Sequence, residues 1–170
     1  MTEYKVKPLQ LGSEAADTKV EVFLNLACPF SINFFKAADK VIKPQTEAGH
    51  ISYTIKHFDK PKVRLLHGAI ANQFLDPGDT ENTYNVMKAL FEDQEAWVSQ
   101  GSTAIQQKMT EAYGLSEQAD AVELSLAVTG ETLERGISSV PTVFIDGKEL
   151  DFDVKRGPTA IEKVLRDAIQ

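Results

Sequence analysis

The chain has 170 residues, of which 42% are hydrophobic and 25% are charged, and its formal net charge is -7. These proportions are ordinary for a globular protein and argue against disorder of the whole chain, and the length suits one domain over residues 1–170. The acidic balance argues against nucleic acid as a partner, because contact with phosphate backbones needs a basic face.

The first twenty residues lack the apolar run of a signal peptide, and no stretch approaches the ~20 apolar residues that span a bilayer. We therefore expect a cytoplasmic protein with no membrane partner, unless a leader peptide has been removed. Cys28 is the only cysteine, so neither an internal disulfide nor a metal site built from thiolates can form. The three histidines also lack the spacing of a metal motif, and we expect no metal and no resident cofactor.

The predicted elements begin with a short strand at residues 4–10, followed by a small, polar loop at 12–18. Residues 20–27 are apolar almost throughout, which predicts a strand buried on both faces. Apolar side chains at helical spacing predict a helix over 31–42, ended by Pro44. Residues 51–58 alternate in polarity and predict a second strand, parallel to 20–27, which makes a right-handed crossover unit.

The middle of the chain is helical by the same spacing rule. The predicted helices cover residues 63–75, 80–98, 103–113 and 116–129, with an extension that stops at Gly136. We expect residues 62–136 to form a helical insertion within the domain. Strands at 142–145 and 148–150, joined by the two-residue turn Asp146-Gly147, then form a hairpin. A last helix at 159–169 completes an α/β arrangement.

The most informative feature is the strand that ends in Cys28-Pro29 and opens a helix. Proline is favoured at the first helical position, which places Cys28 at the helix cap. The free N–H groups and the positive end of the helix dipole then face the sulfur and favour thiolate over thiol. Thiolate is the nucleophile in disulfide exchange, although an arbitrary lone cysteine is more often a small buried hydrophobe.

The residues after Pro29 modify what this sulfur can do. Ser31 stands at the fourth position of the motif, where its hydroxyl can bond to the Cys28 sulfur but cannot resolve a mixed disulfide. Any turnover is therefore monothiol, with an external thiol such as glutathione as co-substrate. Phe30 places an apolar edge beside the sulfur, or packs in the core.

A second constellation, Ser138-Ser139-Val140-Pro141-Thr142, immediately precedes a predicted strand. A cis bond before Pro141 would expose the backbone of Val140, which can pair with an extended peptide or with glutathione. The alternative is a trans proline that opens a strand.

Together these residues resemble the thioredoxin superfamily, and more narrowly its DsbA-like branch. The matching pieces are VEVFLNLACPFSINFF around Cys28 and ETLERGISSVPTVFIDGKEL around Pro141. The resemblance implies a thioredoxin-like fold with a helical insertion, a nucleophilic Cys28, and a cis-Pro141 close to it in space. It also implies that protein or small-molecule disulfides are the substrates.

Two departures from that branch indicate a monothiol protein. Ser31 replaces the resolving cysteine, and Val22 stands where relatives often carry a buried acid, with Glu21 next to it on the opposite side of the pleat. The resemblance therefore favours a monothiol thiol–disulfide oxidoreductase that exchanges disulfides or removes glutathione through Cys28.

Two alternatives stay open. In the first, the fold serves as a peptide-binding or scaffold protein in which Cys28 is inert. In the second, the chain resembles kappa-class glutathione transferases, although these carry a serine or a similar group at the position of Cys28. Monothiol glutaredoxins share the cysteine-to-serine pattern but lack a long helical insertion, and ELDFDVKRGP does not match their glycine-rich segment.

Overall fold

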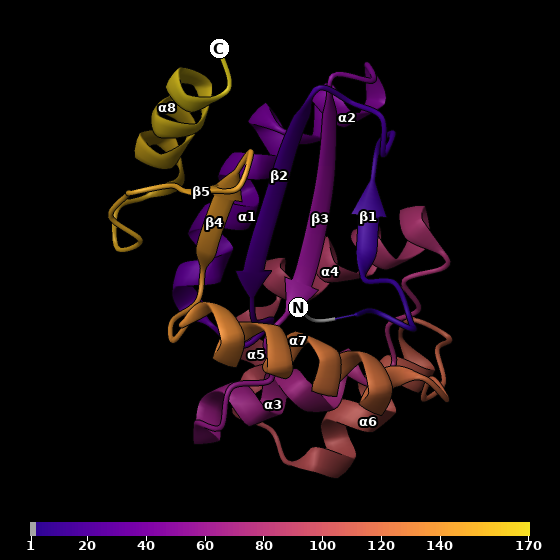
Figure 1. Ribbon diagram of the computed structural model, residues 1–170. Helices are drawn as coiled ribbons and strands as arrows, with labels where there is room; N and C mark the ends of the chain where they lie inside the picture. Colours follow the sequence, from indigo (N-terminus) through magenta and orange to yellow (C-terminus); the bar gives the residue numbers. More distant parts are fainter. Residues whose placement is uncertain (1–2) are drawn as a thin grey trace.

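A five-stranded sheet forms the centre of the computed structural model, which describes residues 3–170 (Figure 1). The strands lie in the order β1–β3–β2–β4–β5. Their bounds are β1 Leu9–Leu11, β2 Thr18–Leu24, β3 Ile51–His57, β4 Thr142–Ile145 and β5 Lys148–Glu149. β2 and β3 are parallel, and the other neighbouring strands are antiparallel, which confirms the predicted crossover unit and the C-terminal hairpin.

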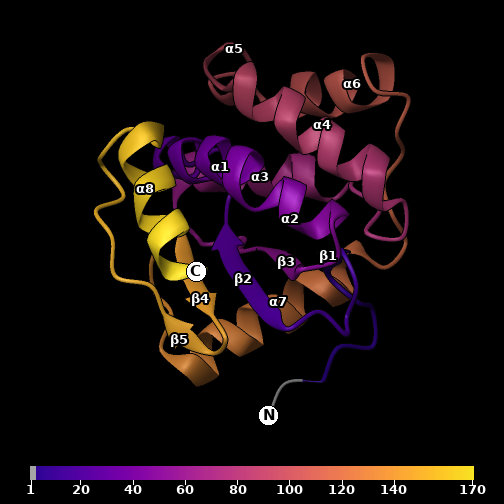
Figure 2. The same ribbon diagram turned by 90° about the horizontal axis from the view of Figure 1, so that it is seen from above.

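Helices cover the sheet on both faces. α1 (Pro29–Val41), α2 (Lys43–Glu47) and α8 (Pro158–Ala168) lie on one face, and α7 (Ala121–Arg135) lies on the other (Figure 2). The middle of β2 is therefore enclosed from both sides, and Val22, Phe23 and Leu24 are fully buried. This burial explains why the strand is apolar almost throughout.

Four further helices form a group, α3 (Val63–Asn72), α4 (Thr80–Glu92), α5 (Gln94–Val98) and α6 (Ser102–Glu111). Of these, α3, α5 and α6 lie beyond the ends of β2 and β3 (Figure 1), while α4 lies on the same side of the sheet as α1 and α2 (Figure 2). Phe35 of α1 packs between Tyr84 and Phe91 of α4, with ring centroids 5.1 and 4.8 Å away. This aromatic contact joins the helical group to the helix that begins beside Cys28.

Several predicted element bounds were wrong, each for a local reason. The first strand begins at Leu9 rather than at residue 4. The predicted helix 80–98 is broken at Asp93 into α4 and α5, where Trp97 turns back and its Nε1–H donates to the Leu90 carbonyl at 2.9 Å. The helix predicted to end before Pro44 does end there, at Val41, and Pro44 lies in the first turn of the short helix that follows, α2, a position that proline tolerates.

The helix predicted to begin at residue 116 begins at Ala121 instead. The Gln118 N–H donates to the Gln73 carbonyl, and the Ala121 N–H donates to the Gln118 carbonyl. The preceding residues therefore follow the end of α3 as a loop. α7 ends at Gly136, whose φ of 67° is left-handed, as the predicted glycine stop requires.

Candidate functional site

Cys28 lies at the N-terminus of α1, directly after the buried strand β2. It is the N-cap residue with φ -80° and ψ 121°, and Pro29 begins the helix. Its side chain is buried, with 4% of the residue exposed. The Sγ–H donates to the Val140 carbonyl oxygen, 3.5 Å away. The free N–H groups of the first helical turn lie at the same end of α1 as the sulfur.

The pairing of β4 with β2 brings the second motif, Val140-Pro141, into contact with the Cys28 sulfur. The Val140–Pro141 peptide bond is cis, and β4 begins at the next residue, Thr142. β4 runs antiparallel to β2 with Thr142 opposite Phe23, so the chain that enters β4 meets the chain that leaves β2. Two motifs 112 residues apart in the sequence are thereby brought into contact.

The other motif residues differ in exposure and partners. Ser31 is fully buried, and its Oγ accepts a hydrogen bond from the Asn25 N–H at 3.3 Å. This hydroxyl therefore bonds to the turn before Cys28, whereas the bond of the Cys28 sulfur goes to Val140. Phe30 is exposed at the surface beside Cys28, with 37% of its area accessible.

Asn25 organises the turn between β2 and α1, and the sequence analysis did not identify it. It is fully buried. Its Oδ1 accepts from the Ala27 N–H at 2.9 Å, and its Nδ2 donates to the carbonyls of Phe58 and Leu65 at 2.9 and 3.1 Å. An asparagine inside an apolar strand was the available signal, because a buried amide needs partners for all its polar atoms.

Gln94 and Arg64, from the helical group, hold the carbonyls of the same turn. Gln94 Nε2 donates to the carbonyls of Leu26 and Cys28 at 2.7 and 3.1 Å. Arg64 Nε donates to the Ala27 carbonyl at 2.8 Å. Neither contact could be predicted from the local sequence, because Arg64 and Gln94 lie far along the chain from the residues that they contact.

His57 completes this support from the end of β3. Its Nε2 accepts the Leu26 N–H at 3.0 Å, so the neutral ring carries its proton on Nδ1, which lies 2.7 Å from Asp59 Oδ1. His57 therefore bonds to the backbone before Cys28 and does not form a Cys–His pair. Asp59 also accepts from Asn72 and Ser125.

Exposed apolar side chains stand close to this turn. Val63 and Leu66 of α3 are 80% and 45% exposed, and they lie in the same first turn as Arg64, whose Nε donates to the Ala27 carbonyl. Phe30, in the first turn of α1, is the third exposed apolar side chain on the helices that adjoin this turn, and we call these three side chains the apolar rim. Such a rim is suited to contact with an extended or partly unfolded chain.

Two negative findings apply to residues 3–170. No group of three or more His, Cys, Asp or Glu side chains is arranged to hold a metal ion there. No helix in that range has the length and apolar character needed to cross a membrane.

A comparison with protein families matches residues 5–166 to a family described as thioredoxin. The match covers almost the whole chain, including both motifs and the helices between them. Among curated protein sequences, none matches the chain.

Solved structures share the fold. A conserved protein of unknown function from Enterococcus faecalis V583 has a TM-score of 0.83 and 25% identity, over 95% of this chain and 90% of that one. MdbA, a thiol-disulfide oxidoreductase from Corynebacterium matruchotii, has a TM-score of 0.63 and 20% identity over 89% and 85%. A protein-disulfide isomerase from Novosphingobium aromaticivorans has a TM-score of 0.67 and 16% identity over 94% and 96%. The α/β, thioredoxin-like fold expected from the sequence is thus confirmed.

Proposed function

Because the chain belongs to the thioredoxin family, we propose that it is a thiol–disulfide oxidoreductase that works through the single thiol of Cys28. The observation that carries the proposal is the contact between the two motifs. The Cys28 sulfur lies at the N-terminus of α1 and 3.5 Å from the carbonyl that precedes cis-Pro141. Nucleophile and substrate-pairing backbone are therefore adjacent.

The chemistry is monothiol exchange. The Cys28 thiolate attacks one sulfur of a substrate disulfide, a new S–S bond forms, and the other substrate sulfur leaves as a thiolate. A second thiol, for which we propose glutathione, then attacks the mixed disulfide. It releases the Cys28 thiolate and leaves as a disulfide with the group that Cys28 had carried. With a glutathionylated protein as substrate, the protein thiol is released in its reduced form, and the glutathionyl group that Cys28 had carried leaves with one free glutathione as glutathione disulfide.

Three parts of the chain support these steps. Cys28 caps the N-terminus of α1, where free backbone N–H groups lie close to the negative charge that the sulfur carries during exchange. Ionisation also removes the Sγ–H that the Val140 carbonyl accepts, which frees that oxygen to pair with a backbone N–H of an extended substrate. The buried Ser31 holds the turn through Asn25 and contributes no second thiol, so release depends on the external one.

A peptide-binding or scaffold role is the second candidate, and one observation favours it. Cys28 is almost fully buried and its thiol is already hydrogen-bonded, while the apolar rim of Phe30, Val63 and Leu66 is exposed. In that role the rim binds a partner chain, and Cys28 packs as a small hydrophobe.

One experiment separates the two candidates. Reduced protein is mixed with glutathione disulfide and followed by intact mass spectrometry, and reduced glutathione is then added. We expect one glutathionyl group on the native protein, none on Cys28→Ser, and release of the group by reduced glutathione. Modification only after the protein is unfolded in denaturant would overturn the oxidoreductase proposal and leave the binding role.

A second measurement follows the rate at which iodoacetamide alkylates Cys28. A rate that is already high near neutral pH would support thiolate chemistry.

A further inference from the structure

Positive charge is concentrated beside Cys28 in a protein whose net charge is -7. Residues 59–64, with the sequence DKPKVR, include the end of the connection between β3 and α3 and the first two residues of α3, and they carry cations at Lys60, Lys62 and Arg64. We call these three residues the cationic segment. Of the 18 lysines and arginines in the chain, these three follow one another at alternate positions next to the candidate site.

Two members of the cationic segment contact the two loops that meet at the sulfur. Lys60 Nζ donates to the Ser138 carbonyl, in the loop that leads to cis-Pro141. Arg64 Nε donates to the carbonyl of Ala27, the residue before Cys28. Two of the three cations are therefore held by backbone carbonyls of the two loops that meet at Cys28, Lys60 by the loop before Pro141 and Arg64 by the residue before Cys28.

Of the three cations, Arg64 has the one carboxylate partner in the described part of the chain, and the carboxylate of the neighbouring Asp59 bonds to His57, Asn72 and Ser125 instead. Within residues 3–170, neither Lys60 nor Lys62 forms an ion pair with a carboxylate. Arg64 pairs with Glu95 at 2.8 Å, but the two side chains are 42% and 81% exposed. Exposed pairs of this kind contribute little free energy, so a substrate carboxylate can replace that of Glu95 on the outer edge of the guanidinium.

We propose that the cationic segment selects anionic disulfides, which carry carboxylates on the groups joined to the sulfurs, as glutathione disulfide does. This inference rests on the proposed function, because it concerns the substrate of the same sulfur. The carboxylates are attracted to Lys62 and to the outer edge of Arg64 while the Cys28 thiolate attacks the disulfide. The exchange itself is unchanged: one S–S bond forms, one breaks, and one thiolate leaves.

The test compares two chromogenic disulfides, dithiobis(nitrobenzoate), which is a dianion, and dithiodipyridine, which is neutral. The ratio of their second-order rate constants with Cys28 cancels changes in the intrinsic reactivity of the sulfur. Lys62→Glu, at an exposed position, should lower the ratio about fivefold at low ionic strength. Glu95→Gln, which removes the competing carboxylate, should raise the ratio. Both changes should shrink in high salt, because ions screen exposed charges.

The matched control is Lys163→Glu, the same charge reversal at an exposed position of α8, which should leave the ratio unchanged. A ratio that moves equally in Lys62→Glu and Lys163→Glu would overturn the inference and leave the proposed function intact. Failure of native Cys28 to react with either disulfide would overturn the proposed function itself. Glutathione disulfide and the cationic disulfide cystamine provide the biological arm: Lys62→Glu should slow the first relative to the second.

Discussion

Asp59 shows how one buried carboxylate supports the turn that carries Cys28. It contacts His57 from β3, Asn72 from α3 and Ser125 from α7. Burial raises the pKa of Asp59, but the interaction with His57 and the hydrogen bonds from Ser125 and Asn72 outweigh burial and hold the pKa below its usual value. His57, fixed by this carboxylate, in turn accepts the Leu26 N–H.

At the residue scale, Asp59→Asn should change the dependence of stability on pH. A carboxyl whose pKa is lower in the folded protein contributes stability above its unfolded pKa of about 3.9, and this contribution is lost as pH falls through the folded pKa. The wild-type free energy of unfolding should therefore fall more steeply below about pH 4 than that of the variant. At neutral pH the variant should be less stable by about 1–3 kcal/mol.

Urea unfolding between pH 2.5 and 7 measures both effects. Asp151→Asn is the control, because Asp151 is exposed in the loop after β5, and its curve should parallel the wild type. If the free energy of unfolding of Asp59→Asn also changes with pH in parallel with that of the wild type below pH 4, then ionisation of Asp59 does not contribute to the pH dependence of stability.

At the scale of the element, two helical glycines have opposite surroundings. Gly68 of α3 faces the turn before Cys28, and a Cβ added there would lie 2.1 Å from Asn25 Oδ1 and 3.0 Å from the Ala27 nitrogen. Gly130 of α7 has no atom within 4 Å of such a Cβ. The close approach of α3 to the turn before Cys28 therefore requires glycine at position 68, whereas α7 could carry a larger residue at position 130.

Alanine substitutions at the two glycines should change stability in opposite directions. Gly130→Ala should stabilise the protein by up to about 1 kcal/mol, because alanine loses less backbone freedom in a helix. Gly68→Ala should destabilise it by about 1–3 kcal/mol, because the methyl group overlaps Asn25 and the turn must shift. Chemical denaturation of both variants gives the comparison, and a stabilised Gly68→Ala would show that α3 does not pack this closely.

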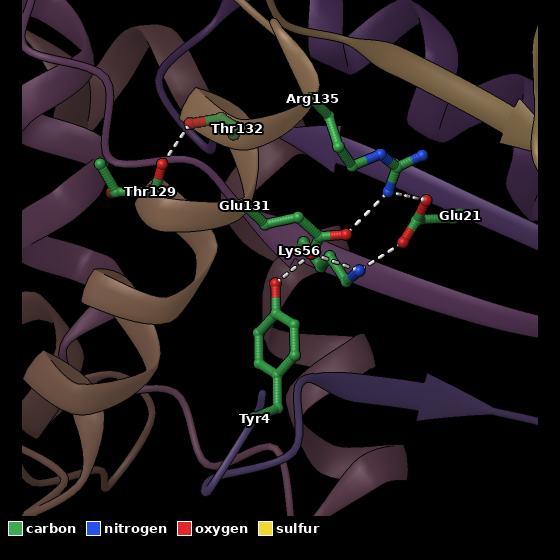
Figure 3. Close-up of polar contacts among 7 residues, drawn as sticks. All are labelled: Tyr4, Glu21, Lys56, Thr129, Glu131, Thr132 and Arg135. Atoms are coloured by element: carbon green, nitrogen blue, oxygen red, sulfur yellow. Dashed lines mark hydrogen bonds and ion pairs between the residues drawn. The ribbon is translucent and has the colours of Figure 1, made fainter. Parts of the chain in front are cut away.

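At the scale of the whole molecule, a charged network joins the sheet to α7 and to the N-terminal segment (Figure 3). Lys56 of β3 is buried and pairs with Glu21 of β2 and with Glu131 of α7. Arg135 bridges the same two carboxylates at 2.8 and 2.7 Å, and the Tyr4 hydroxyl donates to Glu131. Although burial raises the pKa of Glu131, hydrogen bonds from Lys56, Tyr4 and Arg135 hold it below the usual value.

Lys56→Met should destabilise the protein by about 3–5 kcal/mol, because it leaves two carboxylates close together beneath α7 with Arg135 as the remaining cation. Adding Glu131→Gln should recover part of the loss, since one unpaired charge is removed. The exposed pair of Lys5 with Glu123, also on α7, provides the control: Lys5→Met should cost at most about 1 kcal/mol. Thermal unfolding of the three variants measures these losses of stability. Equal losses for Lys56→Met and Lys5→Met would show that the buried network contributes no more than the exposed pair.

The sequence by itself determined those features that depend on neighbouring residues. A continuous apolar run predicted β2, alternation predicted β3, and helical spacing of apolar residues predicted α1 and the helical group, because burial follows the period of each element. The Asp146-Gly147 turn was also predicted, and both residues have the positive φ, 50° and 80°, that such a turn needs. The order of these elements and the two motifs were enough to identify the fold.

Only the tertiary structure decided which side chains surround Cys28. Arg64 and Gln94 reach its turn from α3 and α5, and Lys56 is buried although charge patterns favour exposed lysines. The hydrogen bond from Trp97 to the Leu90 carbonyl, across the break at Asp93, likewise appears only in the tertiary structure. Such contacts join residues far apart in sequence, and their energy depends on geometry that exists only once the sheet and the helices have assembled.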